Sequence, residues 1–148
     1  MKLALFIFSV FLLTANHTFA QTETFDIASF TPPKDWRREV GKEKIAFSVF
    51  DTAKGQFCFL ILHASRQSSG NFEQDFKDDW KQKIGELLNT EAKPEKITKD
   101  VKDGWDIMFG AAKTESSGAQ MAVYLMMFRH QQTVFSIVTA LNNIAHHN

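Results

Sequence analysis

Alternating and continuous apolar runs mark most of the chain after residue 40. Residues 44–50 alternate apolar and polar positions, the period-two pattern of a half-buried strand. Residues 56–63 and 121–128 are apolar at both odd and even positions, which predicts central strands covered on both sides. Residues 133–140 predict one further strand. These runs indicate a sheet whose middle is buried on two faces.

A charged hairpin is predicted between the central runs. Residues 96–102 can form a strand rich in lysine, and Asp103-Gly104 is a strong signal for a tight turn. Residues 105–109 are predicted to form the second strand of this hairpin. Trp105, Ile107 and Phe109 alternate there with Asp106 and Met108. Because so charged a strand suits a solvated position, residues 96–102 are expected at an edge of the sheet.

One segment has helical periodicity. Asn71 is a candidate N-cap, and Gln74 three residues later completes a plausible capping box. The helix is expected to end over residues 89–94, because the residue before Pro94 is pushed out of helical geometry. Its apolar stripe consists of Phe72, Phe76, Trp80, Ile84, Leu87 and Leu88.

The segment before these elements carries a fixed turn. Residues 25–30 have weak strand character, and Pro32-Pro33 then interrupts any regular element. The turn ends in Trp36, which is expected to act as an aromatic plug.

Together the elements predict an α+β fold, a mainly antiparallel sheet packed against one helix. A second cover is required, since an exposed strand face of three or four large side chains forgoes several kcal/mol at about 25 cal/mol per Å². The N-terminal segment, a partner subunit or a second helix could supply it. Residues 141–148 are too short and polar to be that helix. We expect either a truncated or frame-disrupted reading of a domain that ends in a C-terminal helix, or an edge around Met126 exposed in a homodimer.

The first twenty residues predict a secretory signal peptide. Lys2 precedes an apolar run over residues 3–13, which is too short to span a bilayer, and a small-residue exit leads to cleavage between Ala20 and Gln21. Gln21 stands where a lipoprotein needs Cys. The expectation is therefore a bacterial chain with a signal peptide at 1–20 and one domain at 21–148, secreted or periplasmic, soluble and without a stable membrane anchor.

Composition narrows the classes of function. The formal net charge is +0, with both signs interspersed, which argues against nucleic acid as a partner because phosphate binding needs a basic face. The single cysteine, Cys58, cannot form an internal disulfide. Stability must therefore come from side-chain packing, and the 15 phenylalanines are the main source of large core side chains.

A search for catalytic chemistry gives little. Cys58 and His63 are a candidate nucleophile and base, but their separation along one strand puts them on opposite faces. The carboxylate pairs Asp78-Asp79 and Asp100 with Asp103 lie among lysines and are expected on solvated faces. His130, His146 and His147 lack the spacing of a zinc site. The sequence predicts no catalytic residue, no metal site and no cofactor.

Two tryptophans are the candidate contact residues. Trp80 lies on the helical stripe and is expected in the core. Trp36 and Trp105 lie beside turns, where partial exposure is more common, so they are the residues expected to contact a partner or ligand.

The chain resembles the PsbP-like fold, an α/β/α sandwich also found in the Ran guanine-nucleotide release factor and in secreted bacterial proteins. The resemblance rests on residues 30–36, the strands around Phe47 and Phe59, the helix at 72–88 and Gly104-Trp105. It covers about residues 24–141. It implies an accessory or binding role without catalysis, and it implies a C-terminal helix that this sequence lacks.

The leading hypothesis is a non-catalytic accessory domain that binds an envelope protein. A carrier of a small apolar ligand is second and requires a cavity between helix and sheet. A hydrolase with an unrecognised site is third, and would require His63 or His130 beside an acid and a hydroxyl group.

Overall fold

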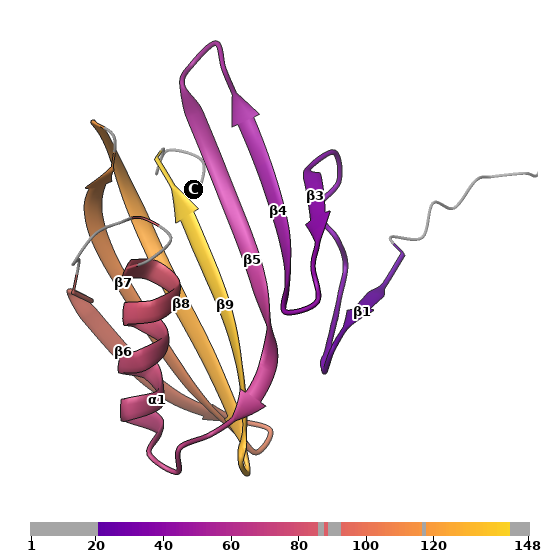
Figure 1. Ribbon diagram of the computed structural model, residues 1–148, viewed down its shortest axis with the longest axis vertical. Helices are drawn as coiled ribbons and strands as arrows, with labels where there is room; N and C mark the ends of the chain where they lie inside the picture. Colours follow the sequence, from indigo (N-terminus) through magenta and orange to yellow (C-terminus); the bar gives the residue numbers. More distant parts are fainter. Residues whose placement is uncertain (1–20, 86–87, 89–92, 117, 143–148) are drawn as a thin grey trace, which may run out of the picture.

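The computed structural model describes residues 21–85, 88, 93–116 and 118–142. Residues 1–20, where a signal peptide is predicted, and the histidines at 146 and 147 lie outside them. The main strands are β3 (Arg37–Val40), β4 (Lys44–Asp51), β5 (Gln56–Gln67), β6 (Lys96–Lys102), β7 (Trp105–Ser116), β8 (Ala119–His130) and β9 (Thr133–Leu141). They form one antiparallel sheet in the order β3-β4-β5-β9-β8-β7-β6, with a helix across one face (Figure 1). The fold is a sheet-dominated α+β fold.

Every strand that alternation or apolar runs predicted after residue 40 is present. β5 continues four residues beyond the predicted end, through an irregularity of register between His63 and Arg66. β6 is an edge strand that pairs only with β7 in the sheet, as its charges predict. β3, at the other edge, was not predicted.

The helix begins where the N-cap was predicted. It comprises α1 (Phe72–Asp79), followed by a π-helical segment, η1 (Trp80–Gly85). The backbone N–H of Gln74 donates to the Asn71 side chain at 3.0 Å. The Gln74 side chain donates to Asp78 instead of closing a capping box, so that part of the prediction is wrong. A continuous α-helix was also expected, and a π-helix replaces it over Trp80–Gly85. Leu87 and residues 89–92, where the helix was expected to end, lie outside the described residues.

The helix and the sheet are in direct contact. Phe76 and Ile84 of the apolar stripe are 1% and 0% exposed, and Phe76 packs over β7 at Gly110. A Cβ atom at Gly110 would lie 2.6 Å from Cζ of Phe76 and 3.0 Å from Cζ3 of Trp80. Only glycine therefore allows the helix to lie this close to the strand.

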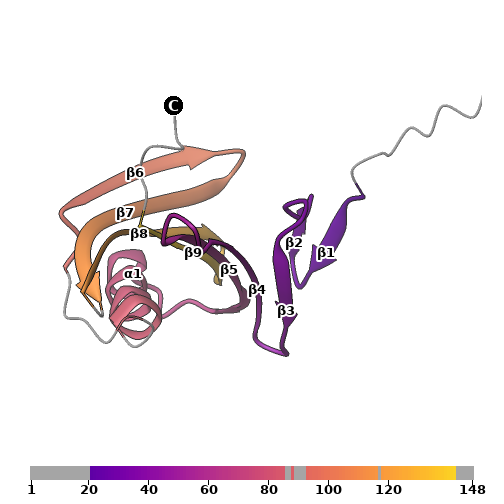
Figure 2. The same cartoon turned by 90° about the horizontal axis from the view of Figure 1, so that it is seen from above.

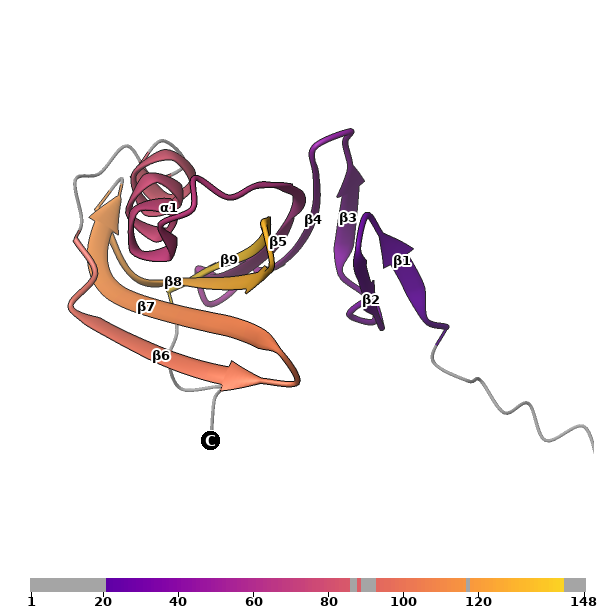
Figure 3. The same cartoon turned by 90° about the horizontal axis from the view of Figure 1, so that it is seen from below.

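The opposite face of the sheet carries the N-terminal hairpin. The segment at 25–30, expected as one weak strand, contains a tight turn between β1 (Glu23–Phe25) and β2 (Ala28–Phe30). Asp26 in this turn has a φ of 52°, and its carboxylate accepts a hydrogen bond from the backbone N–H of Ser65 at 2.5 Å. Figures 2 and 3 show the hairpin beside β3 and β4, away from α1.

The hairpin supplies part of the second cover, which was one of the expected solutions. The second core, on the face without the helix, consists of Ile45, Phe47, Leu62 and Phe135, with Phe25, Ala28, Phe30, Trp36, Leu60, Phe128 and Ile137 packed against it. Met126 is half-buried inside the sheet, opposite Ile137 on β9 and Phe109 on β7. The expectation of an exposed edge at Met126 is therefore wrong, because β8 has a strand on each side.

Candidate binding site

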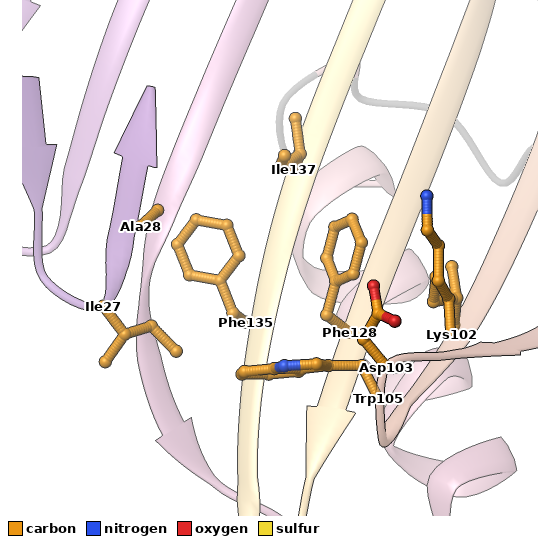
Figure 4. A pocket seen from close by; sticks show the side chains of 9 residues that line it. Ile27, Ala28, Lys102, Asp103, Trp105, Phe128, Phe135 and Ile137 are labelled. Carbon is orange, nitrogen blue, oxygen red and sulfur yellow. The ribbon is translucent and has the colours of Figure 1, made fainter. Parts of the chain in front are cut away.

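An apolar cavity of about 420 Å³ lies on the face without the helix. It is bounded by the β1–β2 turn on one side and the β6–β7 hairpin on the other, with β8 and β9 between them (Figure 4). Its lining residues are Ile27, Ala28, Lys102, Asp103, Trp105, Ile107, Phe128, Phe135 and Ile137. We call it the apolar cavity.

Strand register builds the floor of the apolar cavity. Ile107 on β7 lies opposite Phe128 on β8, and Phe128 lies opposite Phe135 on β9. The ring centroids of the two phenylalanines are 6.4 Å apart, with the rings tilted by 43°. One row of large apolar side chains therefore crosses three neighbouring strands on this face.

Trp105 is fixed at one end of the apolar cavity. Its ring lies 5.2 Å from that of His130, tilted by 36°. His130 Nδ1 is in turn within hydrogen-bonding distance, 3.0 Å, of the Gly104 carbonyl oxygen. The β6–β7 turn and the end of β8 thus hold the indole in place, and Figure 4 shows it across the end of the cavity below Phe128 and Phe135.

Polar groups occur at the rim. Lys102 at the end of β6 and Asp103 in the β6–β7 turn are exposed, and Asp103 has a φ of 52°. On the opposite rim, Ile27 is 48% exposed. An apolar floor with a few polar groups at the mouth is the usual composition of a binding site for an apolar group.

Only one of the two tryptophans predicted as contact residues lines the apolar cavity. Trp105 lines the apolar cavity, whereas Trp36 is half-buried against the second core and does not line it. Sequence reasoning did not find Phe128, Phe135 or Ile137 as site residues. The sequence did contain a signal for them. Their strands are apolar at both odd and even positions, so each side of the sheet receives a row of apolar side chains.

A group of charged side chains lies between the helix and the sheet, on the face away from the apolar cavity. Asp79 Oδ1 accepts from Arg66 Nε at 3.1 Å and Nη2 at 2.8 Å, and Asp79 Oδ2 accepts from Lys83 Nζ and Ser136 Oγ, each at 2.5 Å. Asp75 Oδ1 accepts from Arg66 Nη1 at 3.1 Å. We call these five residues the buried ion cluster.

The buried ion cluster corrects one expectation about the Asp78-Asp79 pair. Asp78 is on a solvated face as predicted, but Asp79 is 1% exposed. Burial raises the pKa of Asp79, but the charge and hydrogen bond of Lys83 and the hydrogen bonds of Ser136 and Arg66 outweigh it, so the pKa lies below its usual value. The two neighbouring carboxylates thus have opposite environments.

Cys58 and His63 occupy opposite faces of β5, as predicted. His63 lies on the side of Ile61, which packs under the helix, and Cys58 on the side of Leu62 in the second core. Burial raises the pKa of the Cys58 thiol. Burial, with the charges of Lys83 and Lys44, lowers the pKa of His63 to about 4, against the opposing charge of Asp79.

The remaining candidates are dispersed. Asp100 is exposed and accepts from the Val101 backbone N–H at 2.8 Å, and Asp103 is at the rim of the apolar cavity. Within the part of the chain that the structure describes, no three His, Cys, Asp or Glu side chains converge as a metal site would require. None of the helices described there is long and apolar enough to cross a membrane.

No family model and no curated protein matches this chain. The fold is similar to the crystal structure of a protein from Bacteroides thetaiotaomicron VPI-5482, with a TM-score of 0.51 and 14% sequence identity. The match covers 78% of this chain and 38% of that chain. At this identity the likeness concerns the fold alone.

Proposed function

We propose that this chain is a non-catalytic accessory domain that binds an apolar side chain of a partner protein in the apolar cavity. The observation that carries the proposal is the row of Ile107, Phe128 and Phe135 beside Trp105, open on the sheet face that the helix leaves free. Partner proteins commonly anchor a large apolar or aromatic side chain in such a pocket, with polar groups at its margin.

A carrier of a small apolar ligand is the second candidate. A volume of about 420 Å³ lies within the range of cavities that hold small molecules, and the cavity floor is apolar. The cavity is not between helix and sheet, where this hypothesis had placed it, but on the opposite face. A hydrolase is the third candidate and lacks support from His63 or His130, since neither is hydrogen-bonded to an acid among the described residues.

The finer description of fold and location is also part of the proposal. We propose that the domain belongs to the PsbP-like class and that its second helical layer is replaced in part by the β1–β2 hairpin. The hairpin supports this, because it lies on the face opposite α1.

We propose that the domain acts outside the cytoplasm after cleavage of residues 1–20. N-terminal sequencing of the protein released from a bacterial host is expected to begin at Gln21. A mature protein that starts at Met1 and stays in the cytoplasm would refute this part of the proposal.

Blocking the apolar cavity tests the binding function. Ile107→Lys places a charge on the cavity floor and is expected to weaken binding of the neutral fluorescent probe N-phenyl-1-naphthylamine by about tenfold or more, measured by fluorescence titration. Val101→Lys is the matched control, since Val101 is 69% exposed on the neighbouring strand and outside the cavity. Equal binding by the wild type and both variants would contradict the proposal.

Two measurements separate a protein partner from a small ligand. A photo-crosslinking residue at Ile27, on the rim, is expected to give one adduct of defined mass in the secreting host, while the same residue at Val40 on β3 does not. Native mass spectrometry of the purified protein is expected to give the mass of the chain alone. A stoichiometric small molecule that is lost in Ile107→Lys would instead favour the carrier.

A further inference from the structure

A second cavity, of about 890 Å³, lies on the helix side of the sheet. It is open to solvent and bordered by the β3–β4 turn, by β5 and by η1, and Figure 3 shows α1 lying over this side of the strands. Its charged lining residues are Lys42, Glu43, Lys44, Arg66 and Lys83. We call it the lysine cavity. It shares no lining residue with the apolar cavity.

Arg66 does not contribute free donors to the lysine cavity. Its Nε bonds Asp79, its Nη1 bonds Asp75 and the Gln67 carbonyl oxygen, and its Nη2 bonds Asp79 and the Asp75 carbonyl oxygen. A guanidinium has five N–H groups, and these five bonds occupy all of them. The charge of Arg66 is therefore already balanced inside the buried ion cluster.

Three lysines in the lining can still offer N–H donors to a bound group. Lys83 Nζ bonds Asp79 Oδ2, and an ammonium has two further N–H donors. Its side chain is only 12% exposed, so the π-helical segment holds this ammonium at the cavity wall. Lys42 and Lys44 form no ion pair with any of the residues that the structure describes. Glu43 is the one acid in the lining.

His63 lies among these lysines as a neutral donor and acceptor. Strand register places it directly opposite Lys44, and it lines the cavity with Lys83. It makes no hydrogen bond to the described part of the chain. Burial and the charges of Lys83 and Lys44 keep its pKa near 4, so one ring nitrogen can donate at neutral pH. Asp79 is the opposing charge, and Lys42, Glu43 and Arg66 complete the charged surroundings.

We propose that the lysine cavity binds the phosphate group of a phosphate monoester, with Lys83, Lys44 and Lys42 as its cationic partners and His63 as a hydrogen-bond donor. A phosphate monoester carries a charge of about −1.5 to −2 at neutral pH, so it gains more than a carboxylate from several ammonium groups. The cavity is larger than a phosphate ion needs, and Ile61 in its lining gives the organic part an apolar contact.

The resonances of the His63 ring report this binding directly. In ¹⁵N-histidine-labelled full-length protein, glycerol 3-phosphate is expected to shift the His63 signals saturably and to raise the His63 pKa, because an anion offsets the lysine charges. Acetate at equal ionic strength is expected to bind about tenfold more weakly or worse. If acetate gives the same saturable shift as glycerol 3-phosphate, the proposal is overturned.

Variants locate the effect in the lysine cavity. Lys44→Met and Lys83→Met are each expected to weaken glycerol 3-phosphate binding by about tenfold. Lys44 is exposed, so Lys44→Met keeps the test valid if Lys83→Met fails to fold. Lys81→Met, an exposed lysine on η1 outside the cavity, is the control and should leave binding within about twofold. Equal weakening by Lys81→Met and Lys44→Met would overturn the proposal.

The same variants identify the source of the phosphate. Vesicles of phosphatidylcholine with and without phosphatidic acid offer the monoester as a lipid headgroup. Sedimentation with phosphatidic acid vesicles that is lost in Lys44→Met, without binding of glycerol 3-phosphate, would identify the lipid as the source and support the site. Absence of both interactions would overturn it.

Discussion

Asp79→Ala is expected to lower the free energy of unfolding by about 3 kcal/mol, because it removes the carboxylate that the largely buried Lys83 and the partly exposed Arg66 share. Lys83 is 12% exposed and loses its single ion pair, while Arg66 keeps Asp75 and reaches water, which limits the loss. Ser136, 1% exposed, also loses the oxygen that accepts its hydroxyl proton. Urea denaturation followed by tryptophan fluorescence measures the change.

The neighbouring residue provides the control for Asp79→Ala. Asp78 is exposed and accepts one hydrogen bond from Gln74, so Asp78→Ala should cost less than about 0.5 kcal/mol. A similar loss in the two variants would show that the buried ion cluster does not stabilise the helix against the sheet.

Asp79 also gives the fold a sensitivity to acid. Its pKa in the folded protein lies below the ordinary value of 3.8, so its contribution to stability is present above that value and is lost as the pH falls toward the folded pKa. The pKa of Asp75 is lowered in the same direction, by hydrogen bonds from Ser68, Ser69 and Arg66 that outweigh its burial. Asp79→Asn should therefore reduce the loss of unfolding free energy as the pH falls, but only in part, because Asp75 still contributes to that loss.

Phe47→Ala is expected to cost about 3–5 kcal/mol and to loosen the N-terminal hairpin. Phe47 is 1% exposed, and its ring meets Phe30 of β2 edge-on, with centroids 5.8 Å apart. Phe50 on the same strand is 54% exposed, so Phe50→Ala is the control and should cost about 1 kcal/mol. Urea denaturation compares the two variants.

Hydrogen exchange distinguishes a loosened hairpin from general destabilisation. In Phe47→Ala the amides of residues 23–30 should exchange faster than those of β8 and β9. If exchange in the hairpin is unchanged, or if both variants cost the same, the second core is not what holds the hairpin on the sheet.

Strands with a regular pattern could be predicted from sequence, and the exceptions have physical reasons. β4 alternates and β5 is apolar on both faces, so local pattern alone identified them. β3 consists of four exposed residues held by pairing to β4, and backbone hydrogen bonds leave no trace in side-chain pattern. The π-helical segment was missed because its apolar residues keep a helical spacing in the sequence.

The sites were harder to predict than the strands. Asp75 and Asp79 are spaced by four residues on one helix side, but the partner that makes their burial possible, Arg66, comes from β5. Trp105 was found because it follows a turn, whereas Phe135 joins the apolar cavity through the position of the β1–β2 turn, far away in sequence. Such long-range placements depend on the whole fold.

The position of β9 sets the order in which the fold can be completed. β9 is the last of the described strands in sequence, yet it lies in the middle of the sheet between β5 and β8, and it carries Phe135, against which the N-terminal hairpin packs. A chain that emerges from the ribosome N-terminus first therefore lacks this central strand until every other described strand has been made. The β5–β9 and β8–β9 pairs, which join the two halves of the sheet, cannot form before that point.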